Sequence, residues 1–251
     1  KRIRQGVEVT PEGALFSEQA RRLVNDARRL TENLSRRNNA LSGVVTVASH
    51  MSSMSSVLTD DLAMFMKLHQ HESVQLIVKE SISKDAVQMV RDGRADLAVV
   101  WDNTETSDLQ HVDYYKDLII AVVHKGHPLA NRKEVNYEEL VAYDLVADKH
   151  TKHTEAMLQR SGGITCGDAR IVVQVESSQS AIRMAAKGIG IYISQQKIAQ
   201  LQVSNLGFVM LPISDSWTRV RVKLVYKSNL FSPVAKALID HLAHQHQSQA
   251  N

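Results

Sequence analysis

The amino-terminal 42 residues carry apolar side chains at a helical spacing. Thr10 and Pro11 mark the start of this segment, because threonine caps a free backbone N–H and proline suits the first helical turn. The apolar positions that follow are separated alternately by four and three residues: Phe16, Ala20, Leu23, Ala27, Leu30 and Leu34. A seam of this kind is typical of two helices that pair along their length. We therefore predict a long dimerising helix over residues 11–42.

From Gly43 onward the pattern changes to short apolar, β-branched runs that alternate with amphipathic segments. The runs predict strands at 44–49, 75–80, 96–101, 118–124, 144–147, 170–176, 189–194, 208–212 and 217–227. The amphipathic segments predict helices at 57–69, 83–92, 154–161, 178–187 and 233–246. Apolar strands that alternate with helices indicate an α/β fold with largely parallel sheets. The pattern leaves open whether one large sheet or two lobes form.

Composition and charge narrow the class of protein. Hydrophobic residues make up 43% of the chain and charged residues 23%, as in ordinary globular proteins, and no apolar run suggests a membrane span or a signal peptide. The single cysteine, Cys166, excludes an internal disulfide and fits a reducing compartment, so we expect a cytoplasmic location without membrane contact. Residues 1–42 hold nine of the basic residues against five acids. Such a concentration is typical of a segment near nucleic acid, although a solvated helix face looks the same.

Five motifs resemble those of LysR-type transcriptional regulators, in family order and across essentially the whole chain. Residues 4–13 (Arg-Gln-Gly-Val-Glu-Val-Thr-Pro-Glu-Gly) resemble the end of the DNA-binding domain and its entry into the linker helix. The other four resemble segments of the ligand-sensing region: 43–49 (GVVTVAS), 90–99 (VRDGRADLAV), 127–130 (HPLA) and 184–191 (MAAKGIGI). Two local departures are Lys187, which interrupts the usual Ala-Ala-Gly, and Gln195, where the family commonly has proline.

The resemblance implies two Rossmann-like subdomains of the periplasmic-binding-protein type II kind, preceded by the dimerising linker helix. Residues 1–10 would be a remnant of the DNA-binding wing and 11–42 the linker helix. Subdomain I would comprise 43–116 and 225–251, and subdomain II 117–224. Most of the winged helix-turn-helix domain would be missing, so promoter DNA would be bound through that absent part. In the remnant, Arg2 and Arg4 would contact only the DNA backbone.

The family binds its effector between the two subdomains, which implies a site for this chain. The expected effector-binding residues are Ser49, His50, Met51, Ser52, Ser53, Ser83, Trp101, Lys149, His150, Thr151, Lys152, Gly190 and Ile191. The basic side chains among them suggest an anionic effector such as a small carboxylate. Alternatively, the serines only cap a helix and Trp101 belongs to the core. We expect His50→Ala to weaken effector binding while leaving stability nearly unchanged.

No pattern of catalytic or metal-binding residues emerges. Cys166 lies in a glycine-rich loop without an identifiable histidine partner, and the histidine pairs 150/153 and 241/244 lack a third ligand. We therefore expect no enzymatic activity, no metal and no cofactor. The favoured function is an effector-responsive transcription regulator that forms a homodimer or homotetramer. The alternative is a solute-binding protein of a transport system, which has the same lobed fold but usually is a monomer.

Overall fold

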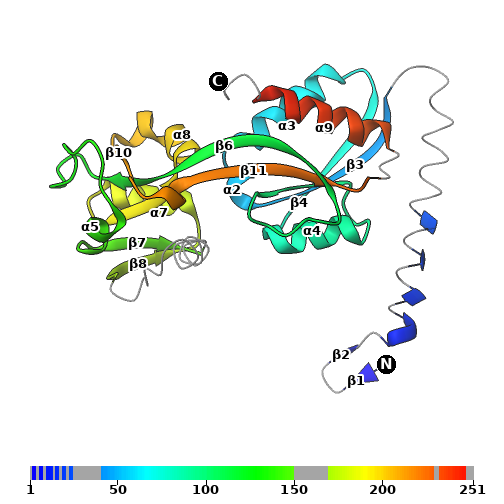
Figure 1. Ribbon diagram of the computed structural model, residues 1–251, viewed down its shortest axis with the longest axis horizontal. Helices are drawn as coiled ribbons and strands as arrows, with labels where there is room; N and C mark the ends of the chain where they lie inside the picture. Colours follow the sequence, from blue (N-terminus) through cyan, green and yellow to red (C-terminus); the bar gives the residue numbers. More distant parts are fainter. Residues whose placement is uncertain are drawn as a thin grey trace. The chain divides into compact units, whose positions relative to one another are not determined.

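The computed structural model in Figure 1 describes residues 2–3, 6–7, 10–13, 15–16, 19–20, 23–24, 41–149, 169–228 and 232–246. The chain forms two compact units. Unit 1 comprises Lys1–Met54, Leu58–Tyr115 and Val222–Asn251, and unit 2 comprises Ser55–Val57 and Lys116–Arg221. In the described ranges, no helix has the length and apolar character that a bilayer crossing requires.

The amino-terminal segment begins with a small hairpin. Strand β1 (Arg2–Ile3) pairs antiparallel with β2 (Gly6–Val7). Residues 11–13, 15–16, 19–20 and 23–24 are helical. Two members of the predicted seam lie in these ranges with most of their surface exposed, Phe16 at 74% and Leu23 at 71%. The seam residues Ala27, Leu30 and Leu34, and the predicted DNA contact Arg4, lie outside the described residues.

Unit 1 is built on a four-stranded sheet. Its strands are β3 (Ser42–Ser49), β4 (Ser73–Glu80), β5 (Leu97–Trp101) and β11 (Arg219–Tyr226, of which residues from Val222 belong to unit 1), in the order β4-β3-β5-β11. β3 pairs parallel with β4 and β5, whereas β11 is antiparallel to β5. Every residue of β5 is buried, which explains its uninterrupted apolar sequence. Because β3 and β5 are parallel, their carboxyl ends lie at one edge of the sheet.

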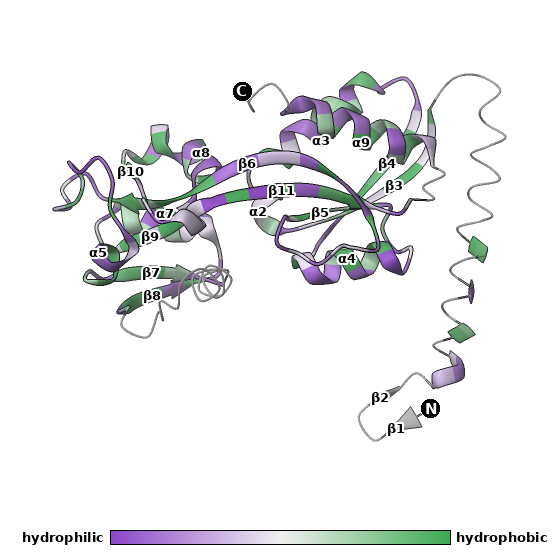
Figure 2. Ribbon diagram, in the orientation of Figure 1, coloured by the Kyte–Doolittle hydropathy of each residue, from purple (hydrophilic) through white to green (hydrophobic). Residues whose placement is uncertain are grey.

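Helices α2 (Met51–Met54), α3 (Leu58–Leu68), α4 (Ser83–Arg91) and α9 (Pro233–Gln245) complete unit 1. α4 buries Ala86, Val87 and Val90 in a cluster with apolar residues of β3, β5 and β11. α9 starts where the hydroxyl of Ser232 accepts the Ala235 N–H. Figure 2 shows hydrophobic and hydrophilic residues alternating along α9, as expected of a helix with one face on a core.

Unit 2 has its own mixed sheet. Its strands are β6 (Gln110–Val123, of which residues from Lys116 belong to unit 2), β7 (Leu145–Asp148), β8 (Ile171–Val175), β9 (Ile191–Gln195) and β10 (Val209–Pro212). The order is β6-β9-β7-β8, and β10 also pairs with β6. β7 runs parallel to β8 and β9, and β6 runs antiparallel to β9 and β10. The carboxyl ends of β7, β8 and β9 share one edge.

Helices α5 (Tyr137–Val141), α7 (Ser178–Ala186) and α8 (Gln196–Leu206) and the 3-10 turn η3 (Ser216–Thr218) belong to unit 2. α7 and α8 pack on the sheet through a cluster that includes Ile182, Tyr192 and Ile198. α8 follows β9 directly and ends at Gly207, whose φ of 63° is a left-handed conformation that glycine adopts without steric cost. The predicted α/β fold class is thus confirmed.

Candidate functional site

The loop after β3 starts from a fully buried serine. Ser49 is the last residue of β3, and its hydroxyl donates to the His50 carbonyl at 3.2 Å. The same carbonyl accepts the Ser53 N–H at 3.1 Å, which turns the chain into α2. Met51 and Ser52 remain half-buried, so they are the parts of this loop that reach toward solvent.

The His50 ring organises this loop. Its Nδ1 accepts the backbone N–H of Ser52 at 3.2 Å and lies 2.9 Å from the Ser52 hydroxyl, which places the ring proton of neutral His50 on Nε2. The ring contacts Trp101 edge to face, with 6.3 Å between centroids, and only 4% of the residue is exposed. A buried ring with these contacts supports the fold, so His50→Ala is expected to lower stability as well.

Ser83 and Trp101 lie at the same edge of unit 1 as this loop. Ser83 opens α4, is 7% exposed and accepts a long hydrogen bond of 3.5 Å from the Trp101 N–H. β3 and β5 run parallel with Ser49 opposite Val99, which brings their carboxyl ends together. Ser53 is anchored there too, since its hydroxyl lies 3.0 Å from that of Tyr115. The structure therefore gathers all seven expected residues of unit 1.

In unit 2, the corresponding edge is fixed by a residue that the sequence interpretation did not single out. Asp148 ends β7 and is 3% exposed, and its Oδ2 accepts hydrogen bonds from Ser178 Oγ at 2.7 Å and Tyr192 Oη at 2.8 Å. Burial raises the pKa of the Tyr192 phenol, so this group remains a donor. Asp148 thereby ties β7, the start of α7 and β9 together immediately before Lys149. The sequence signal that could have identified Asp148 is an acidic residue at the end of an apolar run.

The expected unit 2 residues do not all lie at this edge. Lys149 follows β7 there and is exposed, whereas His150, Thr151 and Lys152 lie outside the described residues. Gly190 and Ile191 lie at the opposite edge, because Ile191 pairs with Leu145 at the amino ends of parallel strands. A Cβ on Gly190 would stand 2.7 Å from the Asp144 carbonyl oxygen. Glycine at this position therefore allows close packing against the backbone of Asp144 in the same unit.

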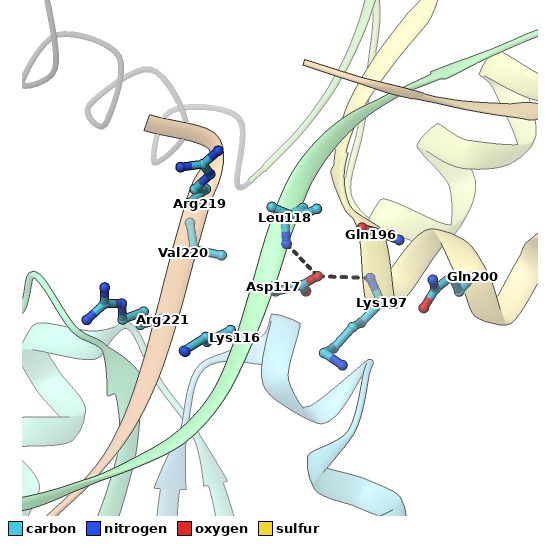
Figure 3. Close-up of a pocket in the computed structure, with 9 residues that line it drawn as sticks. All are labelled: Lys116, Asp117, Leu118, Gln196, Lys197, Gln200, Arg219, Val220 and Arg221. Atoms are coloured by element: carbon cyan, nitrogen blue, oxygen red, sulfur yellow. Dashed lines mark hydrogen bonds between the residues drawn. The ribbon is translucent and has the colours of Figure 1, made fainter. Parts of the chain in front are cut away.

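A pocket of about 440 Å³ lies in unit 2 beyond the carboxyl end of β9, and the sequence interpretation missed it (Figure 3). Its lining comes from β6, α8 and β11: Lys116, Asp117, Leu118, Gln196, Lys197, Gln200, Arg219, Val220 and Arg221. Four of these side chains are basic and one is acidic. No sequence motif could have grouped residues so far apart along the chain.

Some of the histidines considered as metal ligands lie in the part of the chain that is described. No three histidine, cysteine or acidic side chains there lie close enough to hold a metal ion. The histidines of the 241/244 pair instead contact backbone carbonyls, His241 that of Asp61 at 3.2 Å and His244 that of Asp240 at 2.6 Å. Cys166 and the 150/153 pair lie outside the described residues.

Comparison with known proteins places the chain in a family. Residues 38–247 match the family model described as the LysR substrate binding domain. An HTH-type transcriptional regulator of Methanocaldococcus jannaschii, MJ0300, is 20% identical over 221 residues, which cover 85% of this chain and 72% of that protein. The HTH-type transcriptional regulator AceR of Acinetobacter baumannii is 32% identical over 69 residues, or 27% of this chain and 23% of that protein.

Solved structures share the fold over most of the chain. HinK, a LysR family transcriptional regulator from Pseudomonas aeruginosa, is 17% identical with a TM-score of 0.68 and matches 97% of this chain and 84% of its own. The BenM effector-binding domain with benzoate is 15% identical with a TM-score of 0.67, covering 81% and 91%. The family model spans most of the chain and covers the four motifs of the ligand-sensing region. The chain therefore belongs to the LysR family of transcriptional regulators, with its substrate-binding domain at residues 38–247.

Proposed function

We propose that the effector of this chain is a small anion that binds the loops at the carboxyl edge of unit 1. The observation that carries the proposal is the meeting of the Ser49–Ser53 loop, Ser83 and Trp101 at one sheet edge. Ligands of open α/β sheets bind beyond the carboxyl ends of the strands. Ser83 also stands at the start of the nine-residue helix α4, where backbone N–H groups favour negative charge.

The relatives support a carboxylate as the effector. The BenM effector-binding domain has been solved with benzoate and that of QuiR with shikimate, and both ligands are carboxylates. Lys149 is exposed at the carboxyl edge of unit 2, and the family resemblance makes it one of the basic residues expected to contact the effector. In this proposal the chain senses its ligand without transforming it, and the response reaches promoter DNA through a DNA-binding domain of the intact regulator.

Ser83→Ala tests this site. With a panel of benzoate, shikimate and small dicarboxylates, at least one member should raise the melting temperature of the wild-type chain, since ligand at 100 times Kd stabilises by about 2.7 kcal/mol. Loss of one hydrogen bond to a charged ligand should weaken binding of that member by roughly tenfold to a hundredfold. Titration of the Ser83→Ala chain by calorimetry measures the change.

Ser232→Ala is the matched control, because it removes a helix-capping hydroxyl in unit 1 from α9, which carries none of the loop residues. This variant should lose about 1 kcal/mol of stability but keep its affinity. If no carboxylate binds, or if Ser83→Ala binds as tightly as the wild type, the proposed site is wrong.

We also propose that the chain self-associates through the amino-terminal helix. Leu15, Phe16, Leu23 and Val24 are all more than half exposed in the single chain. Pairing of two helices would remove this apolar stripe from water. A dimer would also favour a transcription regulator over a solute-binding protein of a transport system, which usually is a monomer.

Analytical ultracentrifugation at micromolar concentration should show a dimer or a larger species. Leu23→Glu should shift the chain toward monomer by placing a charge in the seam. Ile171→Glu, a change at an exposed residue of β8, should leave the assembly unchanged. A wild-type chain that sediments as a monomer would contradict the proposal.

A further inference from the structure

The unit 2 pocket is built at the end of a strand and the start of a helix. β9 ends at Gln195 and α8 begins at Gln196, while the antiparallel β6 brings Ile119 opposite Gln195. The pocket therefore lies where β9 turns into α8, with β11 supplying a further wall (Figure 3). All of its lining residues belong to unit 2.

A buried carboxylate lies among the lining residues. Asp117 is 7% exposed, and its Oδ1 accepts the backbone N–H groups of Leu118 at 2.8 Å and Lys197 at 3.2 Å. Its Oδ2 is buried and accepts no hydrogen bond from the described part of the chain. A buried carboxylate oxygen without a donor is costly and uncommon in folded proteins. Asp117 is thus held in place on one side and open to a donor on the other.

The other charged residues that line the pocket are basic and favour a negatively charged ligand. Lys116, Lys197, Arg219 and Arg221 place four positive charges around the single carboxylate. The first turn of α8 adds backbone N–H groups whose dipoles also favour an anion. A plain anion would satisfy the basic groups but would face Asp117 with like charge. An anion that also carries a hydroxyl satisfies both, because the hydroxyl donates to Asp117 Oδ2.

We propose that this pocket is a second ligand site, which binds a small hydroxyl-bearing anion such as a hydroxycarboxylate or a sugar-type phosphate ester. It shares no residue with the loops of the proposed effector site and goes beyond that proposed function. The chain also passes from unit 1 into unit 2 along β6 and returns from unit 2 into unit 1 along β11. A ligand held between them contacts the chain at both of these passages.

Matched pairs of probes test the proposal by calorimetry on the full chain at pH 7.5. Malate should bind saturably and about tenfold more tightly than succinate, which has the same charge and lacks the hydroxyl. Glycerol 3-phosphate should likewise bind more tightly than inorganic phosphate. Asp117→Asn should reduce malate binding to the level of succinate, and Arg221→Gln should weaken every probe that binds by about tenfold or more.

Two controls separate this site from other basic groups and from the proposed effector site. Arg170→Gln removes an exposed arginine of unit 2 outside the pocket and should leave malate binding unchanged, whereas Ser83→Ala reports malate that binds at the loops of unit 1 instead. The proposal is overturned if malate and glycerol 3-phosphate bind no better than succinate and phosphate, or if Arg221→Gln binds like the wild type. It is also overturned if Ser83→Ala abolishes malate binding, a result that would instead support the effector site in unit 1.

Discussion

Asp117→Asn is expected to stabilise the protein at pH 8 relative to the wild type, by an amount that largely disappears near pH 4. Burial raises the pKa of Asp117 to about 6, from an ordinary value of 3.8, although the N–H groups of Leu118 and Lys197 and the charge of Lys197 partly oppose this. The charged groups that face it are Lys116 on β6, Lys197 on α8, and Arg219 and Arg221 on β11. Lysine and arginine keep their charge between pH 4 and pH 8.

The direction of this pH dependence follows from the affinity of Asp117 for its proton in the folded and unfolded chains. Asp117 binds its proton more tightly in the folded than in the unfolded chain, so folding is favoured below pH 4. This contribution is lost as the pH rises from about 4 through about 6. The difference of 6 − 3.8 in pKa corresponds to about 3 kcal/mol above pH 6. Asparagine carries no charge, so the variant does not lose this stability as the pH rises. Any effect of its amide on packing is the same at both pH values.

Urea unfolding of the wild type and the variant at pH 4.5 and pH 8 measures this effect. The difference in free energy of unfolding between the two proteins should change by roughly 2–3 kcal/mol in favour of the variant at pH 8. Asp85→Asn, at an exposed position of α4, should show no comparable change between the two pH values. An Asp117→Asn effect that is the same at both values would show that this carboxyl group does not have a raised pKa.

Asp61→Ala is expected to be among the most destabilising single substitutions in unit 1. Asp61 lies on α3, and its Oδ2 accepts a hydrogen bond from the Tyr114 hydroxyl and lies 2.8 Å from His246 Nε2. The side chains of Asp61 and His246 are only 10% and 12% exposed. Burial raises the pKa of the Tyr114 phenol, which therefore stays protonated and donates. Alanine leaves both donors buried without their acceptor, a loss of about 3–5 kcal/mol.

Asp60→Ala provides the control, because Asp60 is the preceding residue of the same helix and is exposed. It should change the free energy of unfolding by less than about 0.5 kcal/mol. Tyr114→Phe, which removes one donor and keeps the ring, should cost an intermediate amount of about 1–2 kcal/mol. Equal effects of Asp60→Ala and Asp61→Ala in urea unfolding at pH 7 would show that the cluster contributes little.

The strands of this fold were predictable where the sheet buries both of their faces. β5 and β7 read as continuous apolar runs because neither face meets water, and their predicted limits agree with the structure within one residue. β6 was predicted from Leu118 but starts at Gln110. Its first half is polar and largely exposed except for the buried Tyr114 and Tyr115, and such a sequence resembles a loop.

Helix α8 was missed for a related reason. Its sequence is rich in glutamine and carries serine and asparagine, and only Ile198 and Ala199 are buried. Two buried residues give too weak a periodic signal to predict a helix of 11 residues. The neighbouring α7 buries four residues at helical spacing and was predicted.

The candidate residues of unit 1 were predicted from the family resemblance, and Ser49–Ser53 among them are neighbours in sequence. The unit 2 pocket could not be predicted, because Asp117 and Arg221 lie on strands that only the tertiary fold brings together. Gly190 was interpreted as a place where a ligand approaches the backbone. The requirement for glycine was inferred correctly, but the approaching group is the Asp144 carbonyl.

The interrupted course of unit 1 has a consequence for how the chain acquires its structure during synthesis. Unit 2 has all of its residues once Arg221 has been added. Unit 1 at that point lacks Val222–Tyr226, the part of β11 that pairs with β5, and α9, whose Leu238 and Leu242 are fully buried. Unit 1, whose first residues are synthesised before those of unit 2, is therefore the last unit to complete its fold. Until then its sheet has an unpaired edge at β5, which a ribosome-bound chain must keep away from other strands.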